Sequence, residues 1–210
     1  YLYFSQGVLK LQLISVARMG PLFVSFNQLE RRAKDSLFQQ GLIKAVGIGK
    51  GKRPSIVDGT AGLGSDSFLM ASTGSTVSLF ERNSIIYELL SDGLRRYESK
   101  GANALGVLGR MHLEKRDFLK CDDLKASHEV VYLDPMFPIT KKNSLSKKPM
   151  HYLQTILREE TDEFEMISLA RQIATKRIVV KRGIQSPSLA GQDADITYRG
   201  SSSRFDVYLL

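Results

Sequence analysis

The sequence predicts an α/β fold, and two observations support this prediction. From about residue 55 onward, short apolar runs alternate with helical patterns along the chain. Three of these runs end in an acidic residue, at Asp58, Glu81 and Asp134. Such alternation typically gives a mostly parallel sheet with helices on both faces. We therefore expect that architecture, with the acidic residues at one edge of the sheet.

The elements of this region are predicted from the same patterns. A glycine ends each of the first two helices, at Gly74 and Gly101. The predicted strands are 55–59, 76–81, 111–117, 130–134 and 177–181, and the predicted helices are 66–73, 84–101 and 161–175. The last two apolar runs, 195–198 and 204–210, are expected to form an antiparallel hairpin.

The first 50 residues have a different pattern. Two strand-like runs, 8–16 and 21–26, come first. A helical pattern then continues to Val46, interrupted at Gly41. We expect a small N-terminal segment of strands and a helix.

A linker is predicted at 47–54, where glycine, lysine and proline are concentrated. We therefore divide the chain into an N-terminal segment, 1–50, and a main domain, 51–210. The chain opens at Tyr1 rather than at a methionine, so we expect its natural start to lie further upstream.

Composition indicates a folded protein with an anionic partner. Of the 210 residues, 42% are hydrophobic and 25% are charged, as in a globular domain. The formal net charge of +8 favours a polyanionic partner, and nucleic acid is the first candidate. A surface charge that serves only solubility is the alternative.

Metal sites and disulfides are not expected. Cys121 is the one cysteine, which excludes a disulfide framework and a Cys-rich zinc site. The three histidines lack ligand spacing. No apolar run approaches the roughly 20 residues that span a bilayer. We expect a cytoplasmic protein with no membrane partner, and the sequence leaves the oligomeric state open.

The stretch VDGTAGLGSD, residues 57–66, follows the first strand of the main domain and opens a helix. Gly62 and Gly64 allow positive φ and let a ligand approach the backbone. A dinucleotide fingerprint would end in glycine, but the last position here is Ser67. The carboxylate of Asp58 would repel a pyrophosphate. It could accept hydrogen bonds from an ammonium group or, through water, from a sulfonium-bearing amino acid.

Further acidic residues suit the other groups of an adenosine cofactor. Glu81, followed by Arg82, can accept both ribose hydroxyls. Asp117 could accept from an adenine amino group. The alternatives are solvated strand ends, and for Asp66 a simple helix N-terminal residue. Together these groups fit S-adenosylmethionine better than NAD, because that cofactor has a cationic sulfur and no phosphate.

The strand VVYLD, residues 130–134, runs into the turn DPMFP. Pro135 and Pro138 stiffen this turn and remove backbone donors. Asp134 and nearby carbonyls can then accept from the exocyclic amine of a base. Phe137 offers a flat face for a base taken out of its stack. We interpret Asp134, Pro135 and Phe137 as catalytic through positioning. A proline-rich turn that only closes a strand is the alternative.

Five stretches are distinctive in combination: VDGTAGLGSDSF, LFERN, VVYLDPMFP, ATKRIVVKR and RFDVY. Together they resemble the family of 16S rRNA guanine-N2 methyltransferases that act on guanosine 1516, from about Gly20 to the C-terminus. The resemblance implies a class I methyltransferase (Rossmann-like) fold, S-adenosylmethionine as donor and 16S rRNA or the small ribosomal subunit as acceptor. The cofactor contacts that it implies are Ser65, Asp66, Glu81, Arg82, Asp117, Phe118 and Asp134.

Seven basic residues are candidates for contacts with RNA. Four of them follow the DPMFP turn, and three end or begin strands near the same edge. They are Lys141, Lys142, Lys147, Lys148, Lys181, Arg182 and Arg204. The alternatives are a solvated loop for the first four and ordinary surface pairs for the other three.

Other activities stay open on the sequence alone. A D-P-x-F turn also suits the N6 amine of adenine, so an adenine-N6 methyltransferase on DNA or RNA is one alternative. An NAD-dependent oxidoreductase and a nucleic-acid-binding module without transfer activity are two others.

Overall fold

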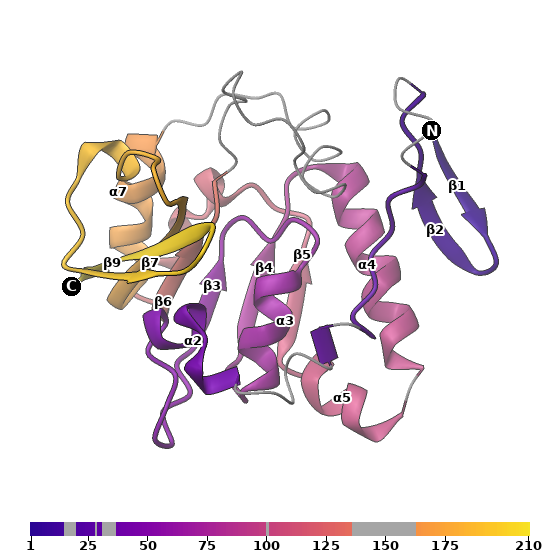
Figure 1. Cartoon of the computed structure of the whole chain (residues 1–210), viewed down its shortest axis with the longest axis horizontal. Coiled ribbons are helices and arrows are strands. Elements are labelled where there is room, and N and C mark those ends of the chain that lie inside the picture. Colours follow the sequence, from indigo (N-terminus) through magenta and orange to yellow (C-terminus); the bar gives the residue numbers. More distant parts are fainter. Residues whose placement is uncertain (15–19, 28, 31–36, 100, 136–162) are drawn as a thin grey trace.

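The computed structural model describes residues 1–14, 20–27, 29–30, 37–99, 101–135 and 163–210. In these residues the main sheet has seven strands, in the order β5-β4-β3-β6-β7-β9-β8 (Figure 1). They are β3 (Ile56–Asp58), β4 (Val77–Phe80), β5 (Met111–Glu114), β6 (His128–Leu133), β7 (Ala174–Gly183), β8 (Ile196–Arg199) and β9 (Ser203–Leu209). Neighbours from β5 to β7 are parallel, whereas β7, β9 and β8 pair antiparallel. The predicted fold class and terminal hairpin are confirmed.

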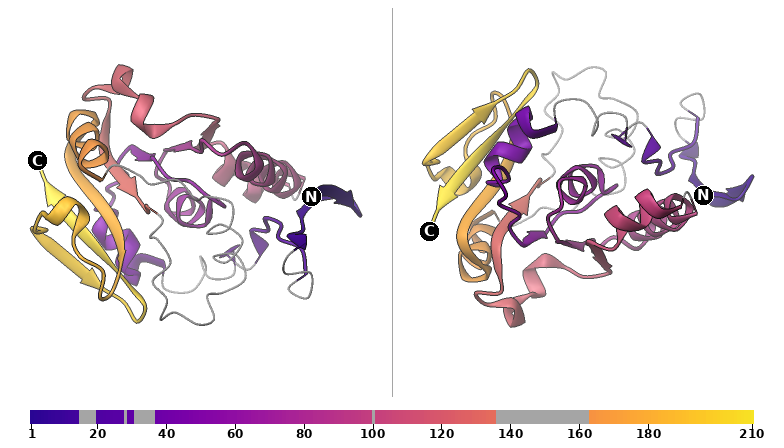
Figure 2. Two further views of the ribbon diagram at one scale, coloured as in Figure 1. Left: turned by 90° about the horizontal axis from the view of Figure 1, so that it is seen from above. Right: turned by 90° about the horizontal axis from the view of Figure 1, so that it is seen from below.

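The centre of this sheet is buried on both faces. All of β3 is buried, and so is β6 from Val130 to Leu133. On one face lie α3 (Ser65–Ser72), α4 (Ser84–Glu98) and α5 (Ala102–Leu108), and on the other lies α7 (Glu163–Ile173) (Figure 2). Near-continuous apolar strands are what a parallel sheet covered on both faces requires. None of the described helices is long and apolar enough to cross a membrane.

The start of α4 is set by a side-chain cap. Asn83 Oδ1 accepts hydrogen bonds from the N–H groups of Ile85 and Ile86, over 3.0 and 3.3 Å. These bonds satisfy donors that have no partner within the helix. The helix ends at Glu98, close to the predicted stop. The next helix, α5, was not predicted, because Gly106 in its middle weakens the helical pattern.

The N-terminal segment packs against α4. Strands β1 (Leu2–Ser5) and β2 (Val8–Leu11) form a hairpin outside the main sheet. The N–H of Leu9 donates to the Asp92 carboxylate of α4 over 3.1 Å. Of the strand predicted at 8–16, the described residues form Val8–Leu11, and 12–14 are not in a strand. Strand β1 was not predicted.

The predicted strand at 21–26 is not formed, apart from one bridge at Leu22. The alternation that predicted it is real, because Leu22, Val24 and Phe26 are all buried. Leu22 bridges Leu11 at the end of β2, but the next two buried side chains pack on helices. Val24 lies against Gly93 of α4, and the Phe26 ring stacks on Phe68 of α3 with centroids 4.8 Å apart. Beyond Leu22, alternate burial thus arose without strand pairing.

The helix predicted to continue to Val46 is represented by α2 (Gly41–Ala45). Its first residue is the glycine that was expected to interrupt it, and residues 31–36 lie outside the described part of the chain. Ile43 is fully buried in the same core cluster as the strands of the main sheet. The division of the chain at residue 50 stays a prediction.

Candidate functional site

The carboxyl ends of the parallel strands bring most of the predicted residues to one edge of the sheet. Asp58, the last residue of β3, lies beside Tyr132 of β6. Between β3 and α3 lie residues 59–64, which we call the glycine turn. Two backbone hydrogen bonds fold it over this edge: Gly59 N–H donates to Tyr132 O, and Ala61 N–H donates to Phe80 O, each over 3.0 Å. In open parallel sheets, ligands bind at this edge.

The glycine turn has the backbone shape that the sequence predicted. Gly62 and Gly64 have φ values of 53° and 73°, in the left-handed region that favours glycine. A Cβ at Gly64 would also lie 2.6 Å from a methyl carbon of Leu90. Around Gly62, by contrast, the nearest described atom to a Cβ would be the Thr60 carbonyl oxygen, at 3.8 Å. A ligand can therefore approach the backbone there.

Asp58 lies beneath the turn rather than at its surface. It is 1% exposed and accepts hydrogen bonds from the Ser67 hydroxyl and, over 3.1 Å, from the Thr60 N–H. Burial raises its pKa to about 7, although both hydrogen bonds oppose the shift. In this structure Asp58 holds the turn, and the contact with a ligand that the sequence predicted, direct or through water, stays a prediction.

Glu81 joins the second strand end to the glycine turn. Its carboxylate accepts from the Gly62 N–H over 3.0 Å and from the Asn83 N–H over 2.7 Å. Burial raises its pKa, while these N–H groups and the neighbouring Arg82 work against the shift. Each carboxylate oxygen has a second lone pair, so Glu81 can still accept from a ribose. The Arg82 side chain is exposed beside it.

Asp117 and Phe118 lie on the other side of the turn. Asp117 accepts from the Leu119 N–H over 3.2 Å and begins a short 3-10 turn. Phe118 is buried, and a Cβ at Gly59 would lie 2.5 Å from its ring. The Phe118 ring therefore supports the start of the glycine turn. Burial raises the pKa of nearby Cys121 to about 11, so its thiol stays protonated near neutral pH and is a poor nucleophile.

A charged cluster lies where β6 and β7 end, beside the first turn of α3. Lys181 Nζ is 2.8 Å from Asp66 Oδ2 and 2.8 Å from Asp134 Oδ2. The Tyr132 hydroxyl also donates to Asp66 Oδ2, over 2.6 Å. We call Lys181, Asp66, Asp134 and Tyr132 the site cluster. The site cluster joins Asp66, which was predicted to contact the cofactor, to Asp134, which was predicted to orient the base.

In the site cluster, the pKa values of Asp134 and Lys181 reflect a balance between burial and the neighbouring charges. Desolvation raises the pKa of Asp134, and Lys181 works against this shift. Desolvation alone would lower the pKa of Lys181, but Asp134 and Asp66 outweigh it, so that pKa is raised. The pKa of Tyr132 is also raised, mainly by burial. The ammonium of Lys181 is thus held charged between two carboxylates.

Sequence reasoning missed this pairing. It treated Lys181 as an RNA contact and Tyr132 only as part of a strand. The available signal was the parallel register, in which Leu133 lies opposite Val180, so that Asp134 and Lys181 follow at neighbouring strand ends. The register could not be assigned before the strand order was known.

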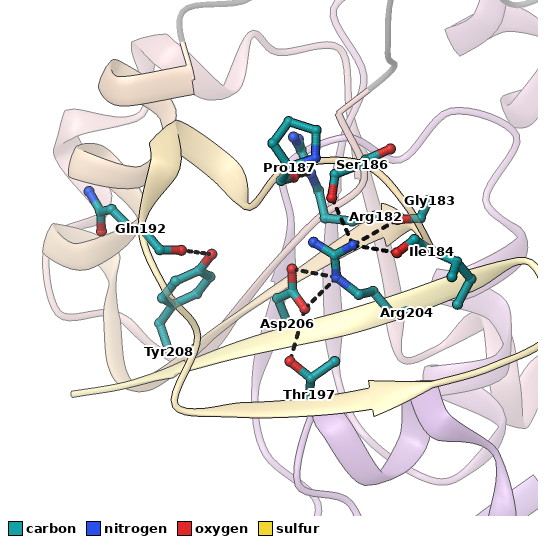
Figure 3. A network of polar contacts seen from close by, with 10 residues as sticks. All are labelled: Arg182, Gly183, Ile184, Ser186, Pro187, Gln192, Thr197, Arg204, Asp206 and Tyr208. Carbon is teal, nitrogen blue, oxygen red and sulfur yellow. Dashed lines mark hydrogen bonds and ion pairs between the residues drawn. The ribbon is translucent and has the colours of Figure 1, made fainter.

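Arg182 and Arg204 have roles that differ from the predicted RNA contact (Figure 3). Arg204 donates to both carboxylate oxygens of Asp206 and to the carbonyls of Gly183, Ile184 and Ser186, at 2.8–3.1 Å. Arg182 donates to Pro187 O over 2.8 Å and to Glu163 over 2.9 Å. Both side chains are buried, so their guanidinium groups serve the fold.

Several predicted residues lie outside the described part of the chain. They are Phe137, Lys141, Lys142, Lys147 and Lys148. Pro135 is buried and is the last described residue before them. Their roles stay predictions. Among the residues that the structure does describe, no group of three or more His, Cys, Asp or Glu side chains could hold a metal ion.

The donor and acceptor groups at this edge fit S-adenosylmethionine. The open backbone at Gly62 allows close approach, and Glu81 supplies acceptors next to it. Ser65 is exposed at the start of α3, next to Asp66. Hydroxyl and ammonium donors, which this cofactor carries, are the natural partners of such carboxylates.

Comparisons with known proteins agree on one family. A family described as putative SAM-dependent methyltransferases matches residues 1–210. A curated relative, Ribosomal RNA small subunit methyltransferase J of Thioalkalivibrio sulfidiphilus, is 39% identical over 96% of this chain and 81% of its own length. The protein of the same name from Coxiella burnetii is 38% identical over 100% of this chain and 83% of its own length.

Solved structures show the same architecture. A SAM-dependent methyltransferase from Neisseria gonorrhoeae has a TM-score of 0.78 and 33% identity, covering 100% of this chain and 82% of its own. Magnesium protoporphyrin IX methyltransferase from Synechocystis, solved with bound SAM, has a TM-score of 0.53 and 13% identity, covering 88% and 92%. The second likeness concerns the fold alone.

Proposed function

Since the chain belongs to the putative SAM-dependent methyltransferase family, we propose that it methylates the exocyclic N2 of a guanosine in 16S rRNA, at a position like guanosine 1516. The acceptor is supported by the curated relatives, which are named as ribosomal RNA small subunit methyltransferases. The net charge of +8 also suits an RNA partner. Such an acceptor would place the reaction in the cytoplasm.

The observation that carries the proposal is the position of Asp134. Its N–H donates to Thr60 Oγ1 over 2.6 Å, which holds the end of β6 against the glycine turn. Its side chain is 33% exposed while it accepts from Lys181. An acceptor carboxylate is therefore accessible at the edge where the cofactor contacts are proposed. Methylation of a base amine requires this arrangement, because it depends on positioning.

The residues of this chain would act mainly on the amine. S-adenosylmethionine, when bound, supplies a methyl group whose bonding electrons stay with the sulfur as the methyl leaves. The guanine N2 is a poor nucleophile, because its lone pair is delocalised into the ring. A hydrogen bond from N2 to Asp134 fixes the direction of the amine.

N2 must lose one proton as the new N–C bond forms. The nearest candidate acceptor is again the Asp134 carboxylate. Partial burial raises its pKa, which makes the carboxylate a better base, and Lys181 limits this shift. We propose that the proton passes to Asp134 and then to water.

Cofactor binding is proposed for the residues around the glycine turn. Glu81 would hold the ribose hydroxyls, and Ser65 with Asp66 would lie near the methionine end. The adenine would lie toward Asp117 and Phe118. Asp58 would act indirectly, by shaping the turn on which these contacts depend.

The proposal is tested by transfer of a tritiated methyl group to unmethylated small-subunit rRNA or small subunits, followed by nucleoside analysis. N2-methylguanosine is the expected product. N6-methyladenosine would overturn the base assignment while keeping the donor. Absence of transfer to either substrate, with cofactor binding retained in calorimetry, would overturn the rRNA acceptor.

A further inference from the structure

The site cluster places a donor and an acceptor side by side. Lys181 lies on β7 and Asp134 at the end of β6, one residue beyond the paired positions Val180 and Leu133. Their side chains meet at 2.8 Å, and they are 27% and 33% exposed. A ligand that reaches this edge can therefore contact an ammonium and a carboxylate together.

Lys181 has a hydrogen-bond donor to spare within this geometry. An ammonium group carries three N–H bonds. Among the described residues, Nζ donates to Asp66 and to Asp134. Two donors hold carboxylates, and no hydrogen bond within the described part of the chain uses the third N–H of this side chain, which is 27% exposed.

We propose that Lys181 donates this hydrogen bond to O6 of the target guanine and so selects guanine over adenine. This inference rests on the proposed function and names the residue that reads the base. The Watson–Crick edge of guanine presents the N2 amine, the N1–H and the O6 acceptor in that order. Asp134 suits the two donors, and Lys181 beside it suits O6.

Adenine would meet the same pair with the wrong pattern. Its N1 is an acceptor and would face the Asp134 carboxylate, and its N6 amine is a donor and would face Lys181. Each polar group would then face a like group, a lone pair against the carboxylate and an N–H against the ammonium, and bound adenine would cover both without a hydrogen bond to either. The pair therefore accounts for a guanine preference that a D-P-x-F turn alone does not provide.

A phosphate contact is the competing role for Lys181. The local charge argues against it, because one ammonium lies between two carboxylates. A phosphate would approach these carboxylates at close range and be repelled. A carbonyl oxygen such as O6 is neutral and avoids this cost.

The test is a double-mutant cycle that combines a change of the target base with a change of a side chain. Splinted ligation supplies small-subunit rRNA with guanosine or 6-thioguanosine at the target, so that one atom is exchanged and position 6 carries a larger and weaker acceptor. Comparison of the variants on the same pair of RNAs separates the contribution of Lys181 from the other effects of sulfur. Transfer kcat/KM is measured for the wild type, Lys181→Met and Tyr132→Phe. The dissociation constant of each RNA is measured in the presence of S-adenosylhomocysteine.

The wild type should prefer guanosine to 6-thioguanosine by about tenfold, as loss of a charge-assisted hydrogen bond predicts. Lys181→Met should reduce this preference to about twofold or less, in affinity as well as in kcat/KM. Tyr132→Phe is the matched control, since it removes another donor of the site cluster. It should lower the rate but keep the wild-type preference.

Two results would overturn the role of Lys181 alone: a wild type without the preference, or a Lys181→Met variant that keeps it while still making N2-methylguanosine. If Lys181→Met does not fold, as judged by thermal unfolding, Lys181→Gln takes its place in the same cycle. Its amide is a neutral and weaker donor, so the preference should fall below that of the wild type, and an unchanged preference would overturn the role of Lys181. A wild type that makes no N2-methylguanosine on the guanosine RNA would instead overturn the proposed function, and the base-reading role with it.

Discussion

Lys181 and Arg182 are adjacent on β7, yet they belong to two different charged regions. Lys181 joins the site cluster on the α3 side of the sheet. Arg182 lies opposite Arg204 of β9 and forms a second region with Glu163, Arg204 and Asp206, which we call the arginine network. Figure 3 shows its two arginines and Asp206. Successive residues of a strand point to opposite faces, so one step along the chain separates the two regions.

Burial separates the two regions in function. The side chain of Arg182 is 1% exposed and that of Arg204 is 9% exposed, and their donors are used by carboxylates and carbonyls of the chain itself. In the site cluster the charged groups are each about a quarter to a third exposed. A charged group that is buried must stay paired if the protein is to remain folded, whereas a partly exposed charged group can exchange or add a partner.

The largest expected effect comes from Arg204→Ala in the arginine network. Removal of this guanidinium leaves the buried Asp206 without its charged partner and takes one donor from each of three carbonyls, those of Gly183, Ile184 and Ser186. The free energy of unfolding, measured in urea, should fall by about 3–5 kcal/mol. Arg199→Ala is the matched control, because Arg199 lies opposite in register but is exposed. Its effect should stay within about 0.5 kcal/mol, and equal effects of the two variants would contradict the comparison.

The second effect is on catalysis rather than on folding. Asp134→Asn keeps the shape of the side chain but removes the charge that faces Lys181 and the proposed amine. The kcat of methyl transfer should fall by about 10²–10³-fold, a typical loss for one group that positions or accepts a proton. Stability should change by less than about 1 kcal/mol, because the pair is partly exposed. Retained kcat would remove Asp134 from the proposed reaction.

The third test concerns Asp58, which is buried like the arginine network but lies at the site. Its pKa of about 7 in the folded protein exceeds the ordinary value of 3.8. Between these values the folded protein holds a proton that the unfolded chain releases. Stability should therefore fall as pH rises from about 4 to 7, and level off above.

Asp58→Asn removes this titration while keeping the size of the side chain. Between pH 5 and pH 7.5, the wild type should lose about 2 kcal/mol of unfolding free energy relative to the variant. Urea unfolding at both pH values measures the difference, and groups common to both proteins cancel. A difference that stays constant or changes sign would mean that Asp58 is ionised throughout.

Much of the fold was predictable because local patterns and burial agree in the main domain. The run at 130–133 is apolar on both faces, and β6 is buried on both faces from Val130 to Leu133. The glycine turn was predictable from Gly62 and Gly64, since positive φ is a local property. At 21–26 the same reasoning failed, because alternation records burial and does not say what covers the chain.

The site was predictable in part for a similar reason. Acidic residues at strand ends had to meet at one edge, and Asp58, Glu81 and Asp134 do. The pairing of Lys181 with Asp134 needed the strand order, which places β7 beside β6. The burial of Arg204 needed the hairpin to fold back on the loop after β7. Both are long-range facts that no local pattern contains.

The smallest expected effect is at the surface. Lys176 of β7 forms an ion pair with Glu129 of β6, but its side chain is 62% exposed, unlike the buried arginines of the arginine network. Lys176→Ala should change the unfolding free energy by less than about 1 kcal/mol at neutral pH, because water already solvates both charges. The hydrogen bond from Lys176 lowers the pKa of Glu129, so the small contribution should vanish as pH falls and the carboxylate is protonated. Urea unfolding at pH 7 and pH 3 checks this. A loss as large as that of Arg204→Ala would mean that burial is not what separates the strong charged pairs of this protein from the weak ones.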